Sequence, residues 1–143
     1  MKEKIITEAI DLFSKFGFKS VTIDDIAEKM SVSKKTIYVH FPKKETLVET
    51  SVMKHFDIII EKMIFISNHS KDPIIELYQM NKEALKHLSN EKNSPIYQLQ
   101  KYYRSIYQKL QIKEFTALGE MFSKSLKRGI ETGLFRPDIN VDF

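Results

Sequence analysis

The sequence has no cysteine, and only four glycines and four prolines occur among its 143 residues. Without cysteine the chain forms neither disulfides nor thiolate metal sites, which agrees with a reducing cytoplasm. The scarcity of chain-breaking residues favours long helices over many short strands joined by turns. We therefore expect an all-α protein, long enough for one compact core or for a small module joined to a second one.

Long apolar runs are also missing from the chain. The longest, residues 58–60 and 63–66, are far too short to span a bilayer. The first residues, Met1-Lys-Glu-Lys-Ile-Ile, lack the apolar segment of a signal peptide. We expect a soluble, cytoplasmic protein with no membrane partner.

The chain has no strong excess of either charge. Its net charge of +4 is too modest to indicate a nucleic-acid binder by itself. The local distribution is more informative, because residues 31–44 contain no acidic residue whereas Asp24, Asp25 and Glu28 precede them. The basic residues of this stretch are Lys34, Lys35, His40, Lys43 and Lys44.

The N-terminal pattern predicts two helices in succession. Apolar residues recur at helical spacing over residues 2–16. Gly17 is suited to end this helix, because glycine enters left-handed conformations without steric cost. Thr22 is a good N-cap for a second helix over residues 23–30, and two acidic residues in its first turn complement the helix dipole.

A tight turn and a third helix follow. Residues 31–33 form the turn, and Ser33 caps a helix over residues 34–40, from which Ile37 points inward. Pro42 suits the first turn of a fourth helix, where its missing N–H is not needed.

The remaining sequence predicts four longer helices. Their expected ranges are residues 43–68, 73–88, 95–110 and 113–132, separated by polar breaks, and Gly133 ends the last one. The chain therefore predicts an N-terminal three-helix domain followed by an antiparallel helical bundle, about seven helices in total.

The pattern predicts two short helices around a tight turn, and the second helix is basic. A helix-turn-helix unit presents its recognition helix to the major groove of DNA in this arrangement. The small Ala27 allows the two helices to cross closely, and Ile37 anchors the second helix in the core. The other faces of that helix can then meet the groove, and they carry Lys34, Lys35, Thr36, Tyr38 and Val39. Capped helix starts after Thr22, Ser33 and Phe41 can also present N–H groups to phosphates.

At this point the sequence resembles the TetR family of bacterial one-component regulators. The resemblance rests on Phe13-Ser-Lys-Phe-Gly17, on Val21-Thr-Ile-Asp-Asp-Ile-Ala27 and on Val32-Ser-Lys-Lys-Thr-Ile-Tyr-Val-His-Phe-Pro-Lys-Lys-Glu-Thr-Leu47. The run Tyr-x-His-Phe-x-x-Lys-Glu-x-Leu within the third stretch is highly specific. The resemblance implies a helix-turn-helix DNA-binding domain over residues 1–46 and a helical ligand-binding or regulatory domain over residues 47–143.

The resemblance also implies roles for single residues. It assigns phosphate contacts, which set the register of the protein on DNA, to Thr22, Tyr38, His40 and Lys44. Ser33 stands at the start of the recognition helix and belongs to the same DNA-binding set. Base edges are met by Lys34, Lys35, Thr36 and Val39, since lysine donates to guanine acceptors and the threonine methyl contacts thymine. The alternative for Tyr38 is a half-buried packing role, and for His40 a helix-end cap.

This chain departs from the family pattern at two positions of the reading head. Ser31 stands where the family favours glycine, so we expect some strain in the turn. Lys35 stands where a small residue is common, which changes the base preference or adds a phosphate contact.

In the resembled family the C-terminal region encloses an apolar small-molecule pocket with a few polar handles. The candidate ligand-binding residues here are Met63, Tyr103, Arg104, Tyr107 and Phe122. Plain core is the alternative for such a methionine- and aromatic-rich pattern. The resemblance implies a repressor that leaves its operator, a double-stranded DNA site, when a small apolar or amphipathic effector tilts the long helix beginning at Lys43.

The resemblance implies a homodimer, but with a reservation. Family members usually carry two more helices after the segment Gly129–Asp138, and those helices form the dimer bundle. This sequence ends at Phe143 without them. A truncated helical interaction module with weak or vestigial DNA binding is therefore the alternative function.

No enzyme is expected. The histidines lack the close spacing of a helical metal site; they are His40, His55, His69 and His87. The sequence contains neither a glycine-rich phosphate loop nor a nucleophile elbow, so we expect no metal and no cofactor.

Overall fold

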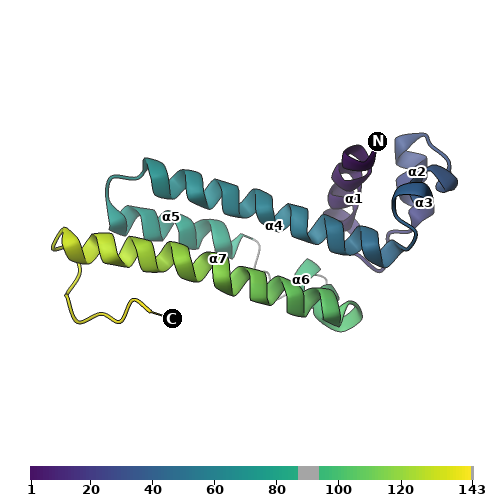
Figure 1. The fold of residues 1–143 in the computed structure, drawn as a ribbon. Helices are drawn as coiled ribbons and strands as arrows, with labels where there is room; N and C mark the ends of the chain where they lie inside the picture. Colours follow the sequence, from purple (N-terminus) through teal and green to yellow (C-terminus); the bar gives the residue numbers. More distant parts are fainter. Residues whose placement is uncertain (87–93, 143) are drawn as a thin grey trace. The chain divides into compact units, whose positions relative to one another are not determined.

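The computed structural model describes residues 1–86 and 94–142. Within these ranges the chain has seven α-helices and no strand, which confirms the all-α prediction (Figure 1). The helices are α1 (Lys2–Phe16), α2 (Ile23–Met30), α3 (Lys34–His40), α4 (Lys44–His69), α5 (Pro73–Leu85), α6 (Pro95–Tyr102) and α7 (Arg104–Glu131). His87 and the expected end of the fifth helix near residue 88 lie outside the described residues.

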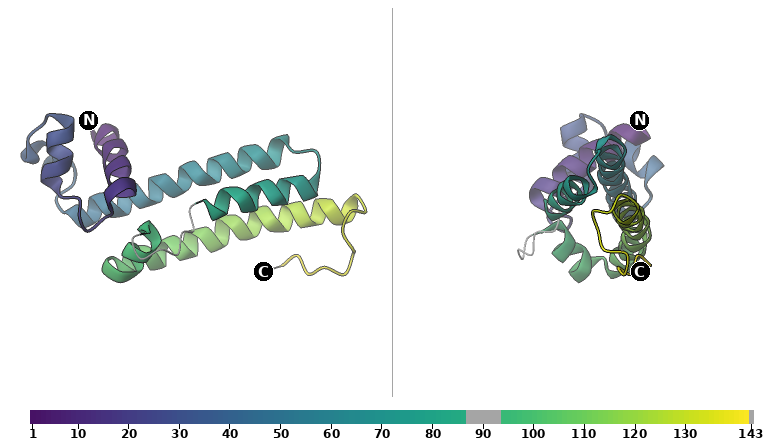
Figure 2. Two further views of the ribbon diagram at one scale, coloured as in Figure 1. Left: turned by 180° about the vertical axis from the view of Figure 1, so that it is seen from behind. Right: turned by 90° about the vertical axis from the view of Figure 1, so that its left-hand side faces the viewer.

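The described residues pack as two compact units. The head unit comprises Met1–Phe56 and the described part of Ser89–Leu110, and the tail unit comprises the described parts of Asp57–Leu88 and Gln111–Phe143. Helices α4 and α7 are each continuous from one unit into the other (Figure 2). The head unit thus contains α6 and more of α4 than the expected domain of residues 1–46, and the functional boundary at residue 46 stays a prediction.

The head unit is built on an apolar core drawn from α1, α2, α3 and the start of α4. Its fully buried side chains include Ile5, Ala9, Phe13, Ile26, Ile37, Phe41, Leu47 and Val48. Gly17 ends α1 with φ 87° and ψ 156°, and its N–H donates to the carbonyl of Phe13 at 2.8 Å. This conformation is open to glycine and strained for other residues, as the sequence predicts.

Capping interactions define α2 and the turn that follows it. The hydroxyl of Thr22 accepts from the N–H of Asp25, whose carboxylate accepts from the N–H of Thr22, so the two residues form a capping box. At the other end Ser31 adopts the left-handed conformation, with φ 54° and ψ 41°. The N–H of Val32 donates to the carbonyl of Ala27 at 3.0 Å, which closes the helix in the manner of a Schellman motif.

We expect Ser31→Gly to stabilise the protein. The left-handed conformation costs a residue with a Cβ roughly 1–2 kcal/mol relative to glycine. The greater backbone entropy that glycine loses on folding offsets about 0.5–1 kcal/mol of that difference. The net gain is about 0.5–1 kcal/mol, or a Tm higher by about 2 °C for a chain of this size. Thermal unfolding followed by circular dichroism measures it, with Ser20→Gly as the matched control because Ser20 is exposed and has no positive φ. A lower Tm for the Ser31 variant would contradict strain at this turn.

The sequence-based boundary between the last two helices is wrong. Residues 111–112 do not interrupt the chain; they lie within α7, and the break is instead at Tyr103, with φ −136° and ψ 53°. Neither glycine nor proline marks Tyr103, so no local signal identifies the break. A tertiary contact accompanies it, since the Tyr103 ring meets the Phe18 ring edge-on with centroids 6.4 Å apart.

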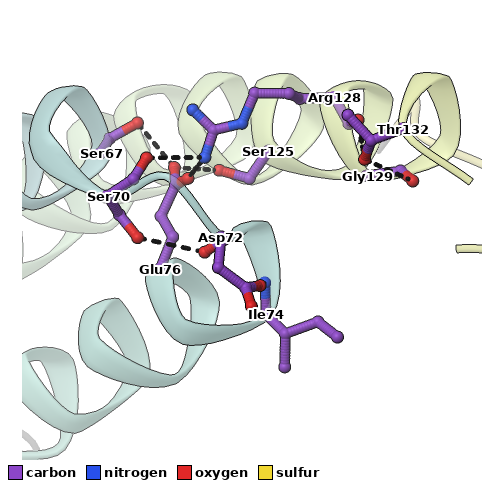
Figure 3. Close-up of polar contacts among 9 residues, drawn as sticks. All are labelled: Ser67, Ser70, Asp72, Ile74, Glu76, Ser125, Arg128, Gly129 and Thr132. Atoms are coloured by element: carbon purple, nitrogen blue, oxygen red, sulfur yellow. Dashed lines mark hydrogen bonds and ion pairs between the residues drawn. The ribbon is translucent and has the colours of Figure 1, made fainter. Parts of the chain in front are cut away.

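The tail unit contains a buried polar cluster formed by Ser67, Glu76, Ser125 and Arg128 (Figure 3). The side chain of Glu76 is 1% exposed. Its carboxylate accepts from the hydroxyl of Ser67 at 2.7 Å, from the hydroxyl of Ser125 and from the guanidinium of Arg128. One carboxylate on α5 thus connects the end of α4 to the last turns of α7.

A search of the described helices finds none that is long and apolar enough to cross a membrane.

Candidate nucleic-acid interface

Helix α3 is held by one buried side chain and presents the rest of its surface outward. Ile37 is fully buried, whereas Tyr38 is 43% exposed and Val39 is 72% exposed. Ser33 caps the start of α3, because its hydroxyl accepts from the N–H of Thr36 at 3.2 Å. The outward face therefore combines a capped helix start with exposed polar and apolar side chains, which suits the edge of a base pair.

Lys34 and Lys35 are both exposed at the start of α3, but their surroundings differ. The ammonium of Lys34 pairs with the carboxylate of Asp24 at 2.8 Å, and this hydrogen bond raises the pKa of Lys34 above its ordinary value. Lys35 has no carboxylate within 4 Å in the described part of the chain. Of these two predicted base-contacting residues, Lys35 can bind DNA without breaking an ion pair. Lys34 must first break its ion pair with Asp24 or share its ammonium between Asp24 and the DNA. The Asp24–Lys34 pair has no local sequence signal.

Thr22 and Asp25, at the start of α2, lie near Lys44, at the start of α4. The Thr22 hydroxyl also donates to the Asp25 carboxylate at 2.7 Å, and the hydrogen bonds from Thr22 hold the pKa of Asp25 below its ordinary value. Lys44 is half-buried, and its ammonium donates to the carbonyl of Lys19 at 3.4 Å. Burial lowers the pKa of Lys44, against an opposing attraction from Asp25. A fixed, partly desolvated ammonium of this kind is a good phosphate ligand.

Two further predicted phosphate ligands lie on the later part of α3. Tyr38 is exposed, and His40 is half-buried in the last turn beside the fully buried Phe41. The structure thus brings all nine predicted DNA-binding residues into the head unit, on α3 or at the starts of α2 and α4. Their contact with DNA stays a prediction.

The five predicted ligand-binding residues are divided between the two units. Tyr103, Arg104 and Tyr107 belong to the head unit, whereas Met63 and Phe122 belong to the tail unit. Met63 is 1% exposed. Burial raises the pKa of Tyr103, with a smaller effect from Glu45. The set as a single ligand site stays a prediction.

Sequence reasoning missed the part that α6 has in the head unit. The side-chain oxygen of Gln98 accepts from the N–H of Lys19 at 3.3 Å, across 79 residues of sequence. The ammonium of Lys19 lies 4.4 Å from the ring centroid of Tyr102. A separation of this length leaves no periodic signal in a single sequence.

A search of the described residues finds no group of three or more histidine, aspartate or glutamate side chains that could hold a metal.

Two capped helices around a left-handed turn, with one inward anchor and a basic outward face, define a helix-turn-helix protein. Residues 5–50 match the family model of bacterial regulatory proteins of the tetR family. Over this N-terminal stretch the chain is similar to the TetR family, as its motifs indicate.

Curated relatives match the N-terminal half of the sequence. The negative transcriptional regulator IcaR of the biofilm operon icaADBC from Staphylococcus aureus strain Newman is 40% identical over 79 residues, which are 55% of this chain and 42% of the relative. IcaR from Staphylococcus epidermidis is 38% identical over 80 residues, with the same coverage. The match therefore spans less than half the length of these relatives.

Solved structures match nearly the whole chain in fold. FadR from Bacillus subtilis, in complex with stearoyl-CoA, has a TM-score of 0.74 at 19% identity, covering 99% of this chain and 77% of the other. A putative transcriptional regulator from Saccharomonospora viridis, in complex with choline, has a TM-score of 0.81 at 19% identity, covering 99% and 75%. At this identity the likeness concerns the fold alone.

Proposed function

We propose that this protein is a DNA-binding transcriptional repressor that leaves its operator when a small apolar or amphipathic ligand binds. The observation that carries the proposal is the outward face of α3, capped by Ser33, anchored by Ile37 and flanked by the partly buried ammonium of Lys44. Relatives named as negative regulators support the direction of regulation. The stearoyl-CoA and choline complexes of structural relatives support an amphipathic effector.

In this proposal the phosphate contacts are made by Tyr38, His40, Thr22 and Lys44, and the base edges are met by Lys34, Lys35, Thr36 and Val39. Two copies of the chain bind two half-sites in the cytoplasm, and no catalytic step is involved. A helical interaction module without DNA binding is the competing function, and the two differ in their response to DNA and salt.

Selection of bound fragments from random duplexes tests the proposal. We expect one enriched sequence with two related half-sites about one helical turn, or a multiple of it, apart. Affinity for that sequence should fall steeply with salt, with a log–log slope of about −0.9 for every phosphate contacted. Binding without any enriched sequence, or with a flat salt response, would favour the interaction module.

The Asp24–Lys34 pair leads to a prediction about affinity. Asp24→Asn releases Lys34 and removes a negative charge from the face that meets DNA. Because an exposed ion pair is weak, operator affinity should rise only modestly, by about 1.5- to 5-fold in fluorescence anisotropy. The same change should lower stability slightly, because α2 loses an acidic residue of its first turn. Glu28→Gln, at an exposed position later in α2, is the matched control. Weaker binding by the Asp24 variant would mean that Lys34 acts through its pair.

A further inference from the structure

The head unit carries a second group of lysines, away from α3, that surrounds an exposed tyrosine. The ammonium of Lys19 lies 4.4 Å from the ring centroid of Tyr102, and that of Lys101 lies 5.3 Å from the same centroid. Lys101 is also 5.7 Å from the ring centroid of Tyr97. We call Lys19, Tyr97, Lys101 and Tyr102 the lysine–tyrosine cluster.

The two lysines of the cluster keep their charge available. Lys19 and Lys101 have no carboxylate within 4 Å in the ranges that the structure describes, whereas Lys29 pairs with two carboxylates of α1. An aromatic ring attracts an ammonium through its quadrupole and so orders it without cancelling its charge. Both side chains are exposed, so a dissolved anion can reach them.

The cluster is continuous with the predicted phosphate contact at Lys44. The backbone of Lys19 joins the two, because its carbonyl accepts from the Lys44 ammonium at 3.4 Å and its N–H donates to Gln98 on α6 at 3.3 Å. All of these residues belong to the same compact unit. Lys19, whose carbonyl holds the Lys44 ammonium, is thus itself one lysine of the cluster, on the α1–α2 loop, and the other, Lys101, lies at the end of α6 against the same tyrosine ring.

We propose that the lysine–tyrosine cluster binds backbone phosphates of duplex DNA outside the base pairs that α3 meets. This inference rests on the proposed function and extends it to the flanks of the operator. Continuity with Lys44 favours DNA over an acidic protein, because a duplex presents its negative charge as an unbroken series along both strands. Lysine contacts of this kind carry no sequence information and lengthen the footprint.

Duplex length separates the cluster from the reading head. Affinity is measured for the selected operator alone and for the same operator with roughly one helical turn of arbitrary sequence added at each end. The unmodified protein should bind the extended duplex more tightly and with a steeper salt slope. The Lys19→Ala/Lys101→Ala variant should lose that gain, its slope on the extended duplex falling by about 1.8 per chain, or 0.9 for each lysine.

Matched variants distinguish charge from structure. Lys19→Arg/Lys101→Arg should keep the gain, because charge and ring contact are both retained. Lys62→Ala/Lys124→Ala removes two exposed lysines of the tail unit and should change nothing. The alanine variant keeps the backbone N–H and carbonyl of Lys19, so the contact with Lys44 is preserved, and its thermal unfolding should match that of the unmodified protein.

The outcomes separate this inference from the function on which it rests. If the alanine variant gains from the added flanks as much as the unmodified protein does, the inference is overturned, while binding to the operator leaves the proposed function standing. A loss that is equal on the short and the extended duplex also overturns it, because the cluster then contacts the operator itself. If no duplex is bound at any length, the proposed function fails first.

Discussion

Glu76→Gln is expected to destabilise the protein by about 3 kcal/mol. Breaking a buried ion pair by removing one charge costs about 3–5 kcal/mol, because the remaining charge is left without a partner. We take the lower end of that range because the side chain of Arg128 is 35% exposed and can be partly rehydrated. The amide is nearly isosteric with the carboxylate, so the loss reports charge and hydrogen bonding rather than a cavity.

Urea unfolding followed by circular dichroism measures this loss. Glu61→Gln, at an exposed position of α4 in the same unit, is the matched control and should change stability by less than about 0.5 kcal/mol. Ser67→Ala removes one of the donors to the carboxylate and should cost about 1 kcal/mol. A Glu76→Gln protein as stable as the unmodified one would mean that the ion pair between Glu76 and Arg128 does not stabilise the fold.

The double substitution Glu76→Leu/Arg128→Leu gives the sharper result. Replacing both members of a buried pair with apolar residues is often neutral or stabilising, since neither charge then needs to be desolvated. We expect the double variant to be more stable than Glu76→Gln, although Ser67 and Ser125 lose their acceptor. A double variant less stable than the single one would show that the two serines depend on the carboxylate more than the arginine does.

The elements that the sequence predicted correctly are those with local chemistry at their ends. Gly17 ends α1, Thr22 and Ser33 cap α2 and α3, and Gly133 has a positive φ of 74° just after the end of α7. Each signal involves residues within one helical turn of one another, so a single sequence contains it. The outward face of α3 was predicted for the same reason, because one apolar residue, Ile37, determines which side is buried.

The features that the sequence did not predict depend on residues far apart along the chain. The break at Tyr103 has no glycine or proline to mark it, and residues 111–112, where a break was expected, lie within α7. Glutamate is usually a surface residue, so the sequence alone gives no reason to expect Glu76 in the interior. Its partners Ser125 and Arg128 lie about 50 positions later in the sequence. Lys19 meets α6 for an equally non-local reason. Such contacts follow from the tertiary structure rather than from local patterns.

Lys44→Ala is expected to weaken operator binding about tenfold per chain at roughly 0.1 M salt, by removing one phosphate contact and about 0.9 from the log–log salt slope. The effect is large for one lysine because this ammonium is already held by the carbonyl of Lys19 and is half-buried, so little side-chain freedom is lost on binding. Lys62→Ala, at an exposed position of the same helix in the tail unit, should leave both affinity and slope unchanged.

The pH dependence of the Lys44 contribution can be predicted in sign. Burial lowers the pKa of Lys44, so its charge is lost at a lower pH than that of an ordinary lysine. A neutral amine does not attract phosphate, and the advantage of the unmodified protein over Lys44→Ala should therefore shrink as pH rises, before exposed lysines deprotonate. Fluorescence anisotropy at constant ionic strength over the alkaline range measures that ratio. If the ratio of the two affinities stays constant until ordinary lysines titrate, phosphate binding restores the usual pKa of Lys44. If the unmodified protein and Lys44→Ala have the same salt slope, Lys44 is not part of the interface.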